Sequence, residues 1–257
     1  MNILVMAGTS DASRLIKNLK NSKKDVYITA TTVTDYGAQL AQEAGADRVL
    51  PKALPQHELT HILIDLNIDV LVDATHPFAA EATRNAIKAA RKTQTKYLRL
   101  ERPPLNLPDN ELIHIVRSFQ EAAQLAQKIT DGPILHLAGV STLFHLINII
   151  DKGRIVARVL PSSYSINKCL ELGLSGEKII AMQGTFSIEF NQALMKEYHA
   201  GVIITKESGE SGGTISKIEA ALKLKIPVIV VERPEIHELK KEKVKGSVEE
   251  LLMELIK

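Results

Sequence analysis

The sequence predicts an α/β protein with two similar domains, each built on a mostly parallel sheet, and a cleft between them. Short apolar segments alternate with amphipathic ones along the whole chain, as expected for strands covered by helices. The second half repeats motifs of the first at a constant spacing. The 257 residues are 45% hydrophobic and 24% charged, a globular composition with room for two domains.

In the first half, strand and helix patterns alternate without a break. Segments with a helical apolar period are separated by short buried-strand segments, and Gly45 ends the second helical segment. We expect strands at 3–7, 25–33, 47–50, 69–74 and 96–101, and helices at 13–20, 36–45, 57–67 and 77–92.

Three motifs recur 131 residues later in the same order. The paired segments are 3–10 (ILVMAGTS) and 134–141 (ILHLAGVS), 83–92 and 214–223, and 97–103 (YLRLERP) and 228–234 (VIVVERP). Each ERP motif is followed by a loop and a capping-box helix start, at Ser118 and at Ser247. One interpretation is that unrelated αβ units share such patterns; we favour two similar domains.

The domain boundary is expected in the proline-containing segment 104–131. Pro103, Pro104 and Pro108 stiffen this linker. We therefore predict an N-terminal domain over 1–107 and a C-terminal domain over 108–257, with a last helix that packs on either of them.

Composition excludes several classes of function. A net charge of +2, 4% aromatic residues and no Trp argue against nucleic-acid binding. The N-terminus resembles a first strand rather than a signal peptide, and no apolar stretch reaches the length of a membrane span. The single cysteine, Cys169, fits a reducing cytoplasm. The histidines are scattered, without a Cys/His cluster, so no metal site is expected.

In open α/β sheets, ligands bind beyond the carboxyl ends of the strands, and the first such loop is AGTSDASRL. Gly8 permits a tight turn, and Ser10 or Asp11 can cap the next helix, leaving N–H groups for a phosphate. An ordinary capped turn is the alternative, because the full G-x-G-x-x-G pattern is missing. The second strand ends in hydroxyls, including Thr31, and not in the acidic residue typical of NAD sites.

The loop DATHPF places polar residues at a strand-to-helix corner. Pro77 suits the first helical turn, so His76 is expected at or beside the N-cap, where a protonated imidazole is disfavoured. Asp73 and Thr75 can bond the exposed amides, and Phe78 can pack on the domain. Capping and packing alone are the alternative to a functional role.

The loop over 206–214 of the second half combines a lysine with small residues. Lys206 ends a strand, and the loop holds Ser208, Gly209, Gly212 and Gly213 before Thr214 can cap a helix. Such a loop can bind an anion through its backbone amides. It lacks the G-K-[ST] of a P-loop, and a merely mobile glycine loop is the alternative.

Taken together, AGTSDASRL, DATHPFA, YLRLERP, LAGVSTL, QGTFS, TKESGESGGTISKIEAA and PVIVVERP resemble the precorrin-6A reductase family of cobalamin biosynthesis over nearly the whole chain. The resemblance implies two Rossmann-like domains with the macrocycle between them. Thr185 is a departure, because the family has Gly-Pro-Phe where this chain has Gly-Thr-Phe. TVTDYG is closer to the cobalt-inserted, anaerobic branch than to the aerobic branch.

The resemblance further implies that NADH or NADPH delivers hydride to a ring double bond of precorrin-6A or its cobalt form. Hydride then comes from the cofactor, and the protein supplies position and electrostatics. His76 is expected to position the reactants or to donate the proton. The cofactor-binding residues are expected to be Gly8, Thr9, Ser10, Thr31, Asp73 and Thr75. The substrate-binding residues are expected to be Pro77, Phe78, Lys206, Ser208, Gly209, Gly212, Gly213 and Thr214.

Two other classes of function stay open from the residues alone. One is a non-redox tetrapyrrole or nucleotide-sugar enzyme on a similar frame, and the other is a ligand-binding sensor whose cleft closes without chemistry. The expected partner is an anionic tetrapyrrole, and the protein is expected to be a monomer or a small homo-oligomer.

Overall fold

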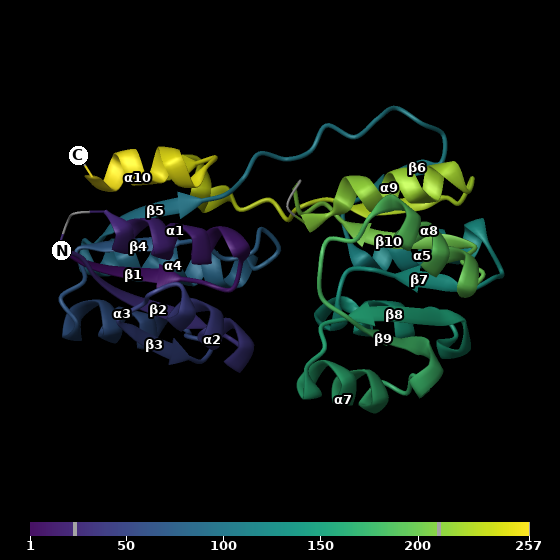
Figure 1. Ribbon diagram of the computed structural model, residues 1–257, viewed down its shortest axis with the longest axis horizontal. Coiled ribbons are helices and arrows are strands. Elements are labelled where there is room, and N and C mark those ends of the chain that lie inside the picture. Colours follow the sequence, from purple (N-terminus) through teal and green to yellow (C-terminus); the bar gives the residue numbers. More distant parts are fainter. Residues whose placement is uncertain (23–24, 210–211, 257) are drawn as a thin grey trace. The chain divides into compact units, whose positions relative to one another are not determined.

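The computed structural model describes residues 1–22, 25–209 and 212–256 (Figure 1). The chain divides into two compact units, of which the first comprises Met1–Pro103 with Pro234–Lys257 and the second Pro104–Arg233. The boundary thus falls at Pro103 instead of residue 107. The last segment belongs to the first unit, which the sequence left undecided.

The first unit is built on a parallel sheet of six strands in the order β12-β5-β4-β1-β2-β3. Its strands are β1 (Asn2–Met6), β2 (Tyr27–Thr32), β3 (Arg48–Pro51), β4 (Val70–Asp73), β5 (Lys96–Leu100) and β12 (Lys243–Lys245). Its helices are α1 (Ser10–Asn21), α2 (Asp35–Glu43), α3 (Gln56–Asp65), α4 (Ala80–Thr93) and α10 (Val248–Ile256). This confirms the predicted α/β class.

The second unit has a parallel six-stranded sheet in the order β6-β11-β10-β7-β8-β9. Its strands are β6 (Ile113–Val116), β7 (Ile134–His136), β8 (Ile155–Val159), β9 (Ile179–Ala181), β10 (Val202–Lys206) and β11 (Val228–Val231). Its α-helices are α5 (Phe119–Ile129), α6 (Phe144–Ile147), α7 (Ser163–Glu171), α8 (Ile188–Glu197) and α9 (Thr214–Lys223). Five strands of each sheet therefore have the same order, and the edge strand beside them comes last in the first unit and first in the second.

One edge strand of each sheet is formed by the segment that follows the ERP motif of the other half of the chain. After β5 the chain enters the second unit and forms β6, which pairs with β11. After β11 it returns and forms β12, which pairs with β5. The amide of Glu101 donates to the carbonyl of Lys245 at 3.0 Å, and the amide of Glu232 donates to the carbonyl of Val116 at 2.9 Å. The two exchanged strands are thus held by equivalent hydrogen bonds.

Both predicted capping boxes lie directly after these exchanged strands. Ser118 Oγ accepts from the Glu121 amide at 3.1 Å, and the Glu121 carboxylate accepts from the preceding backbone at 3.0 Å. Ser247 Oγ accepts from the Glu250 amide at 3.1 Å in the same way. The caps satisfy amides that the first turns of α5 and α10 leave unpaired.

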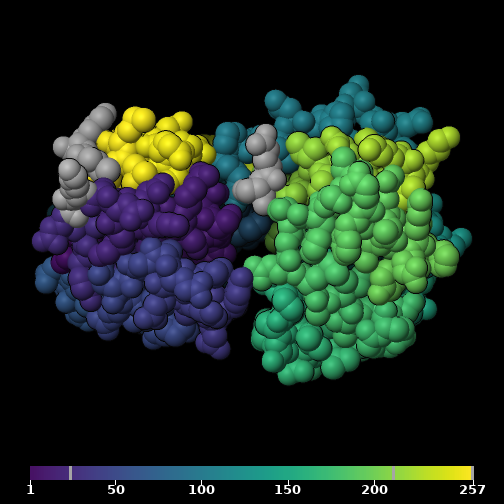
Figure 2. All heavy atoms as spheres, viewed as in Figure 1, coloured from purple at the N-terminus to yellow at the C-terminus, as the bar shows by residue number. Residues whose placement is uncertain are grey.

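Helices cover both faces of the first sheet. Apolar side chains of α1, α2 and α10 form one buried cluster with alternate strand residues, and those of α3 and α4 form the other. Figures 1 and 2 show α10 lying along α1, where Val248, Leu251 and Leu255 complete the first cluster. The exchanged segment therefore supplies part of the core of the first unit.

The second unit has its own core. Side chains of α8 and α9 pack on the sheet through residues that include Met195 and Ile218. Cys169 of α7 is fully buried. Within the described ranges, no helix has both the length and the apolar content needed to cross a membrane.

Candidate functional site

The first turn at the carboxyl edge of the first sheet joins β1 to α1 through Gly8. Gly8 is exposed, has a φ of +115°, and a Cβ built on it would meet nothing within 4 Å. The N-cap is Thr9, whose Oγ1 accepts from the Ala12 amide at 3.1 Å. The predicted caps, Ser10 and Asp11, are instead the first two helical residues, because Thr9 is already extended and adjacent to the turn.

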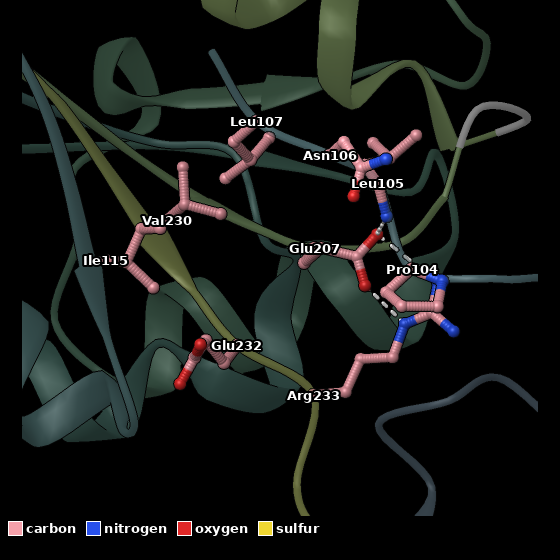
Figure 3. Close-up of a pocket in the computed structure, with 9 residues that line it drawn as sticks. All are labelled: Pro104, Leu105, Asn106, Leu107, Ile115, Glu207, Val230, Glu232 and Arg233. Carbon is pink, nitrogen blue, oxygen red and sulfur yellow. Dashed lines mark hydrogen bonds and ion pairs between the residues drawn. The ribbon is translucent and has the colours of Figure 1, made fainter. Parts of the chain in front are cut away.

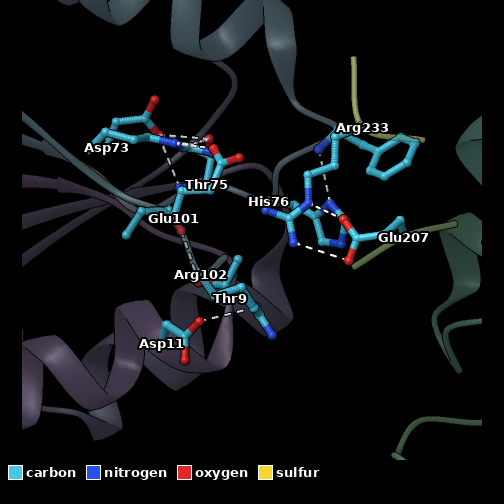
Figure 4. Close-up of polar contacts among 12 residues, drawn as sticks. Thr9, Asp11, Asp73, Thr75, His76, Glu101, Arg102, Glu207 and Arg233 are labelled. Atoms are coloured by element: carbon cyan, nitrogen blue, oxygen red, sulfur yellow. Dashed lines mark hydrogen bonds and ion pairs between the residues drawn. The ribbon is translucent and has the colours of Figure 1, made fainter. Parts of the chain in front are cut away.

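Thr9 also joins this turn to the next loop. Its hydroxyl donates to the carbonyl of Ala74 at 2.8 Å. Asp11, in the first turn of α1, is paired with Arg102 of the first ERP motif at 3.1 Å (Figure 4). Arg102 thereby balances the negative charge that Asp11 places beside the helix N-terminus.

Asp73, at the end of β4, is the centre of a buried polar network. Arg99 donates to its Oδ1 at 2.7 Å, and the Tyr97 hydroxyl donates to its Oδ2 at 3.0 Å. The amide and hydroxyl of Thr75 donate to Oδ1 at 3.0 and 2.7 Å. Asp73 and Arg99 have no exposed surface, so Asp73 fixes the corner rather than presenting its carboxylate to a ligand.

Arg99 is held on two sides. Its second partner is the Glu101 carboxylate, at 2.6 Å. Burial opposes the charged guanidinium, but the carboxylates of Asp73 and Glu101 outweigh it and raise the pKa of Arg99. Burial, and then the Asp73 charge, raises the pKa of Tyr97, so its hydroxyl stays a proton donor to Asp73.

The predicted helix start at Pro77 is wrong, because α4 begins at Ala80. Residues 76–79 form a turn in which the Ala79 amide donates to the His76 carbonyl at 2.8 Å. Pro77 is buried within this turn, and Phe78 lies beside His76 with 5.7 Å between ring centroids. Pro77 suits the second turn position as well as a first helical turn, which is why the sequence did not separate the two.

His76 therefore lies four residues before the helix and not at its cap. The Phe78 amide donates to its Nδ1 at 3.2 Å. A ring nitrogen that accepts this bond carries no proton, which leaves Nε2 as the nitrogen that can donate. The neutral imidazole expected at a helix N-terminus stays a prediction.

Thr31, the remaining residue of the expected cofactor set, lies near the carboxyl end of β2. Its side chain is buried, and its carbonyl accepts from the Ala7 amide at 2.8 Å. This bond fixes the strand beside the Gly8 turn. The structure brings Gly8, Thr9, Ser10, Thr31 and the 73–78 corner together at one sheet edge.

In the second unit, the loop after β10 closes on itself through two hydroxyls. Ser208 and Thr214 are buried, and their hydroxyl oxygens are 3.0 Å apart. The Thr214 hydroxyl also lies 3.3 Å from the Lys206 carbonyl, which can accept from it. The N-cap of α9 is Gly213, with a φ of +64°, and not Thr214. Residues 210 and 211 of the predicted loop lie outside the described residues.

Glycine is required at position 212 of this loop. A Cβ there would overlap with the Ser208 hydroxyl oxygen. The Gly209 amide donates to Glu207 Oε1 at 2.8 Å, and Arg233 of the second ERP motif pairs with the same carboxylate (Figure 4). Each ERP arginine thus pairs with an acidic residue of its own unit, Asp11 in the first turn of α1 and Glu207 in the loop after β10. The repeated motif could have signalled this.

A pocket of about 470 Å³ in the second unit adjoins this ion pair (Figure 3). It is lined by Pro104, Leu105, Asn106, Leu107, Ile115, Glu207, Val230, Glu232 and Arg233. Two carboxylates and one guanidinium give this lining a net negative charge. It therefore does not suit a polyanionic ligand. The loop that begins at Lys206 carries a basic group instead, and burial lowers the pKa of this lysine to about 8.

Arg99 was not identified from the sequence. The available signal was register, since Arg99 pairs directly with Asp73 across β5 and β4. An apolar strand with one arginine opposite an aspartate predicts such a pair only once the strand order is known.

Comparison with known proteins gives consistent matches. A family model described as precorrin-6x reductase CbiJ/CobK matches residues 2–255. The chain is 49% identical to cobalt-precorrin-6A reductase of Methanothermobacter thermautotrophicus over 259 residues, covering 100% of this chain and 84% of that protein. It is 43% identical to cobalt-precorrin-6A reductase of Methanocaldococcus jannaschii, covering 92% of each.

A solved structure of CobK precorrin-6A reductase has the same fold. Its TM-score is 0.77 at 20% identity, with 100% of this chain and 96% of that chain covered. The family match spans both units and includes both ERP motifs and the 73–78 corner. The chain therefore belongs to the precorrin-6x reductase CbiJ/CobK family.

Proposed function

We propose that this protein reduces a ring double bond of cobalt-precorrin-6A or precorrin-6A with NADH or NADPH. Relatives that share 49% and 43% of their residues with it are cobalt-precorrin-6A reductases, which favours the cobalt form of the substrate. The observation that carries the cofactor assignment is the Gly8 turn. Its open space and the adjoining helix N-terminus match the requirements of a dinucleotide pyrophosphate.

The residues of this turn fit the nucleotide. A side chain at position 8 would fill the space through which a pyrophosphate approaches the backbone. Thr9 caps α1 and leaves Ser10 exposed at its first turn. Arg102 offsets the charge of Asp11, which would otherwise repel a phosphate there. When bound, the nicotinamide nucleotide supplies the hydride.

The 73–78 corner holds the groups beside this turn in place. Asp73 acts through Thr75, which it fixes by two hydrogen bonds, while Thr31 supports the neighbouring strand end. With Nδ1 accepting from the Phe78 amide, His76 can donate one hydrogen bond to a reactant through Nε2. We assign it positioning rather than proton donation, because an imidazole whose Nδ1 is an unprotonated acceptor has only the weakly acidic Nε2–H to give.

The second unit supplies the groups that fit an acidic macrocycle. Lys206 offers positive charge, and the Gly213 backbone lies at the start of α9. The amides of Gly209 and Gly212 instead donate within the loop, to the Glu207 carboxylate and the Gly209 carbonyl. Ser208 and Thr214 contribute by closing the loop, since both hydroxyls are buried.

The test is anaerobic incubation with cobalt-precorrin-6A and with precorrin-6A, each with NADH and with NADPH. Mass spectrometry should show a gain of two hydrogens in at least one mixture, with loss of reduced nicotinamide absorbance in equal amount. Omission of the nucleotide is the control. Binding of the tetrapyrrole without any mass change in all four mixtures would leave a sensor or a non-redox enzyme.

A further inference from the structure

The strands β8 and β10 and the helix α9 place three basic residues at or near the carboxyl edge of the second sheet. Arg158 is the last residue but one of β8, Lys206 ends β10, and Lys217 lies in the first turns of α9. Arg158 and Lys217 are only 9% and 6% exposed. Buried lysines and arginines are rare in proteins unless a partner balances their charge.

The contacts of Arg158 are with neutral groups. Its guanidinium lies over the Phe186 ring, 5.1 Å from the centroid, and Nη1 donates to Asn191 Oδ1 at 3.5 Å. Asn191 is oriented by its own amide, which donates to the carbonyls of Phe186 and Ser187 at 3.1 and 2.8 Å. A guanidinium has several N–H donors, and this one long bond among the described residues leaves most of that capacity unused.

Lys217 has a neutral partner as well. Its Nζ donates to the carbonyl of Gly212 at 3.2 Å. Across the described ranges, no carboxylate pairs with Arg158 or with Lys217. A buried cation without a counter-charge is unfavourable, and a cluster of them is more so.

The charges of the cluster act on one another. Burial, then the charges of Arg158 and Lys206, lowers the pKa of Lys217 to about 7. Burial lowers the pKa of Arg158 to about 10 and that of Lys206 to about 8. An anion beside Arg158 and Lys217 would relieve both the desolvation of these two cations and the repulsion between them.

We propose that Arg158 and Lys217, together with Lys206, form a binding site for a single oxyanion, a carboxylate or a phosphate. The choice of ligand rests on the proposed function, whose reactants carry both groups: carboxylates on the macrocycle and phosphates on the nucleotide. Arg158 supplies the planar fork that matches either oxyanion, held over Phe186, and the two lysines supply point charges. This extends the predicted loop by residues of β8 and α9.

Inorganic phosphate is the first probe. Addition of phosphate should raise the thermal unfolding midpoint of the wild type, and isothermal calorimetry should detect binding. Lys217→Met and Arg158→Gln should each lose most of this response. Lys223→Met is the matched control, because Lys223 is exposed on the same helix, and it should respond as the wild type does. Equal phosphate responses in all four proteins would overturn the proposal.

The unfolding midpoint without phosphate distinguishes a binding role of Lys217 from a structural one. Without phosphate, Lys217→Met should unfold at or above the wild-type midpoint, since it removes a buried uncompensated cation. A structural lysine would instead leave a lower midpoint with an intact phosphate response, and that result would overturn the proposal. Arg158→Lys, which keeps the charge, should retain part of the phosphate response. It replaces Arg158→Gln as the test if that variant does not fold.

Two further titrations identify the source of the oxyanion. If the site takes a phosphate, Lys217→Met should bind NADH or NADPH at least tenfold more weakly and bind uroporphyrin, a porphyrin octacarboxylate, as the wild type does. If the site takes a carboxylate, Lys217→Met should bind uroporphyrin at least tenfold more weakly and bind NADH and NADPH as the wild type does. Wild-type affinity for all three would overturn the proposal. Phosphate binding is measured without turnover, so it can hold even if no reduction is found.

Discussion

Arg99 and Asp73 form an ion pair across two neighbouring strands, with 2.7 Å between Nη1 and Oδ1 and no solvent exposure of either side chain. Asp73 is the first residue of the 73–78 corner, and its carboxylate also fixes Thr75. It therefore links the stability of the first sheet to the geometry of the proposed site.

Removal of Arg99 should be strongly destabilising. Arg99→Met leaves Asp73 buried without its counter-charge, and we expect a loss of about 3–5 kcal/mol in the free energy of unfolding by denaturant titration. The control is Arg91→Met, which removes an ion pair of the same length, to Glu242, from a half-exposed site. It should cost less than about 1 kcal/mol. Similar losses for both variants would show that the buried network contributes no more than a surface pair.

Gly8→Val should weaken binding of the nicotinamide nucleotide while the protein stays folded. A side chain at this positive φ fills space that the structure leaves open, and the strain is borne by an exposed turn. Gly139 is the matched control, because it occupies the equivalent position of the repeat, with a φ of +87° and equally open surroundings. Fluorescence titration with NADH and NADPH should show loss for Gly8→Val only. Loss for Gly139→Val alone would place the nucleotide in the second unit.

His76→Asn should retain a rate within about tenfold of the wild type. Asn keeps a hydrogen-bonding side chain, and a positioning bond to a neutral group contributes about 0.5–1.5 kcal/mol. A proton donor would contribute about 10²–10⁴-fold instead. Single-turnover hydride transfer and ring protonation, followed across pH, separate the two. A loss above about a hundredfold, with disappearance of a titration near neutral pH, would make His76 the acid.

His136 should make the second unit sensitive to acid. Burial and the nearby Lys206 charge lower its pKa to about 4 from 6.5, although the Gly139 carbonyl favours the charged form. Between these values the unfolded chain binds a proton that the folded protein does not, so the free energy of unfolding falls as pH drops from about 6.5 to about 4.

His136→Gln removes the titrating group and keeps a donor for the Gly139 carbonyl. The wild type should lose stability relative to this variant over that pH range, measured by denaturant unfolding at fixed ionic strength. His61→Gln, at an exposed position of α3, is the control. A difference between wild type and His136→Gln that does not change with pH would contradict the assignment.

The sequence alone determined the parallel α/β class, the repeat and the two capping boxes. These features depend on short-range patterns: apolar period, glycine at the β1–α1 turn, and Ser followed three residues later by Glu. The same patterns set the helix boundaries only approximately. Thr9, Ser10 and Asp11 are all acceptable caps, and only the backbone conformation at Thr9 selects it.

Tertiary structure alone decided which sheet receives each sixth strand. The segments after the two ERP motifs carry the same local signals, and β12 is three residues long with two lysines, so nothing local favours β5 over β11 as a partner. The Asp73–Arg99 pair and the cluster of Arg158, Lys206 and Lys217 also join residues distant in sequence. The chemistry of both groups depends on burial and on which charged side chains the strand order brings to one sheet edge. Residue spacing along the chain does not determine this.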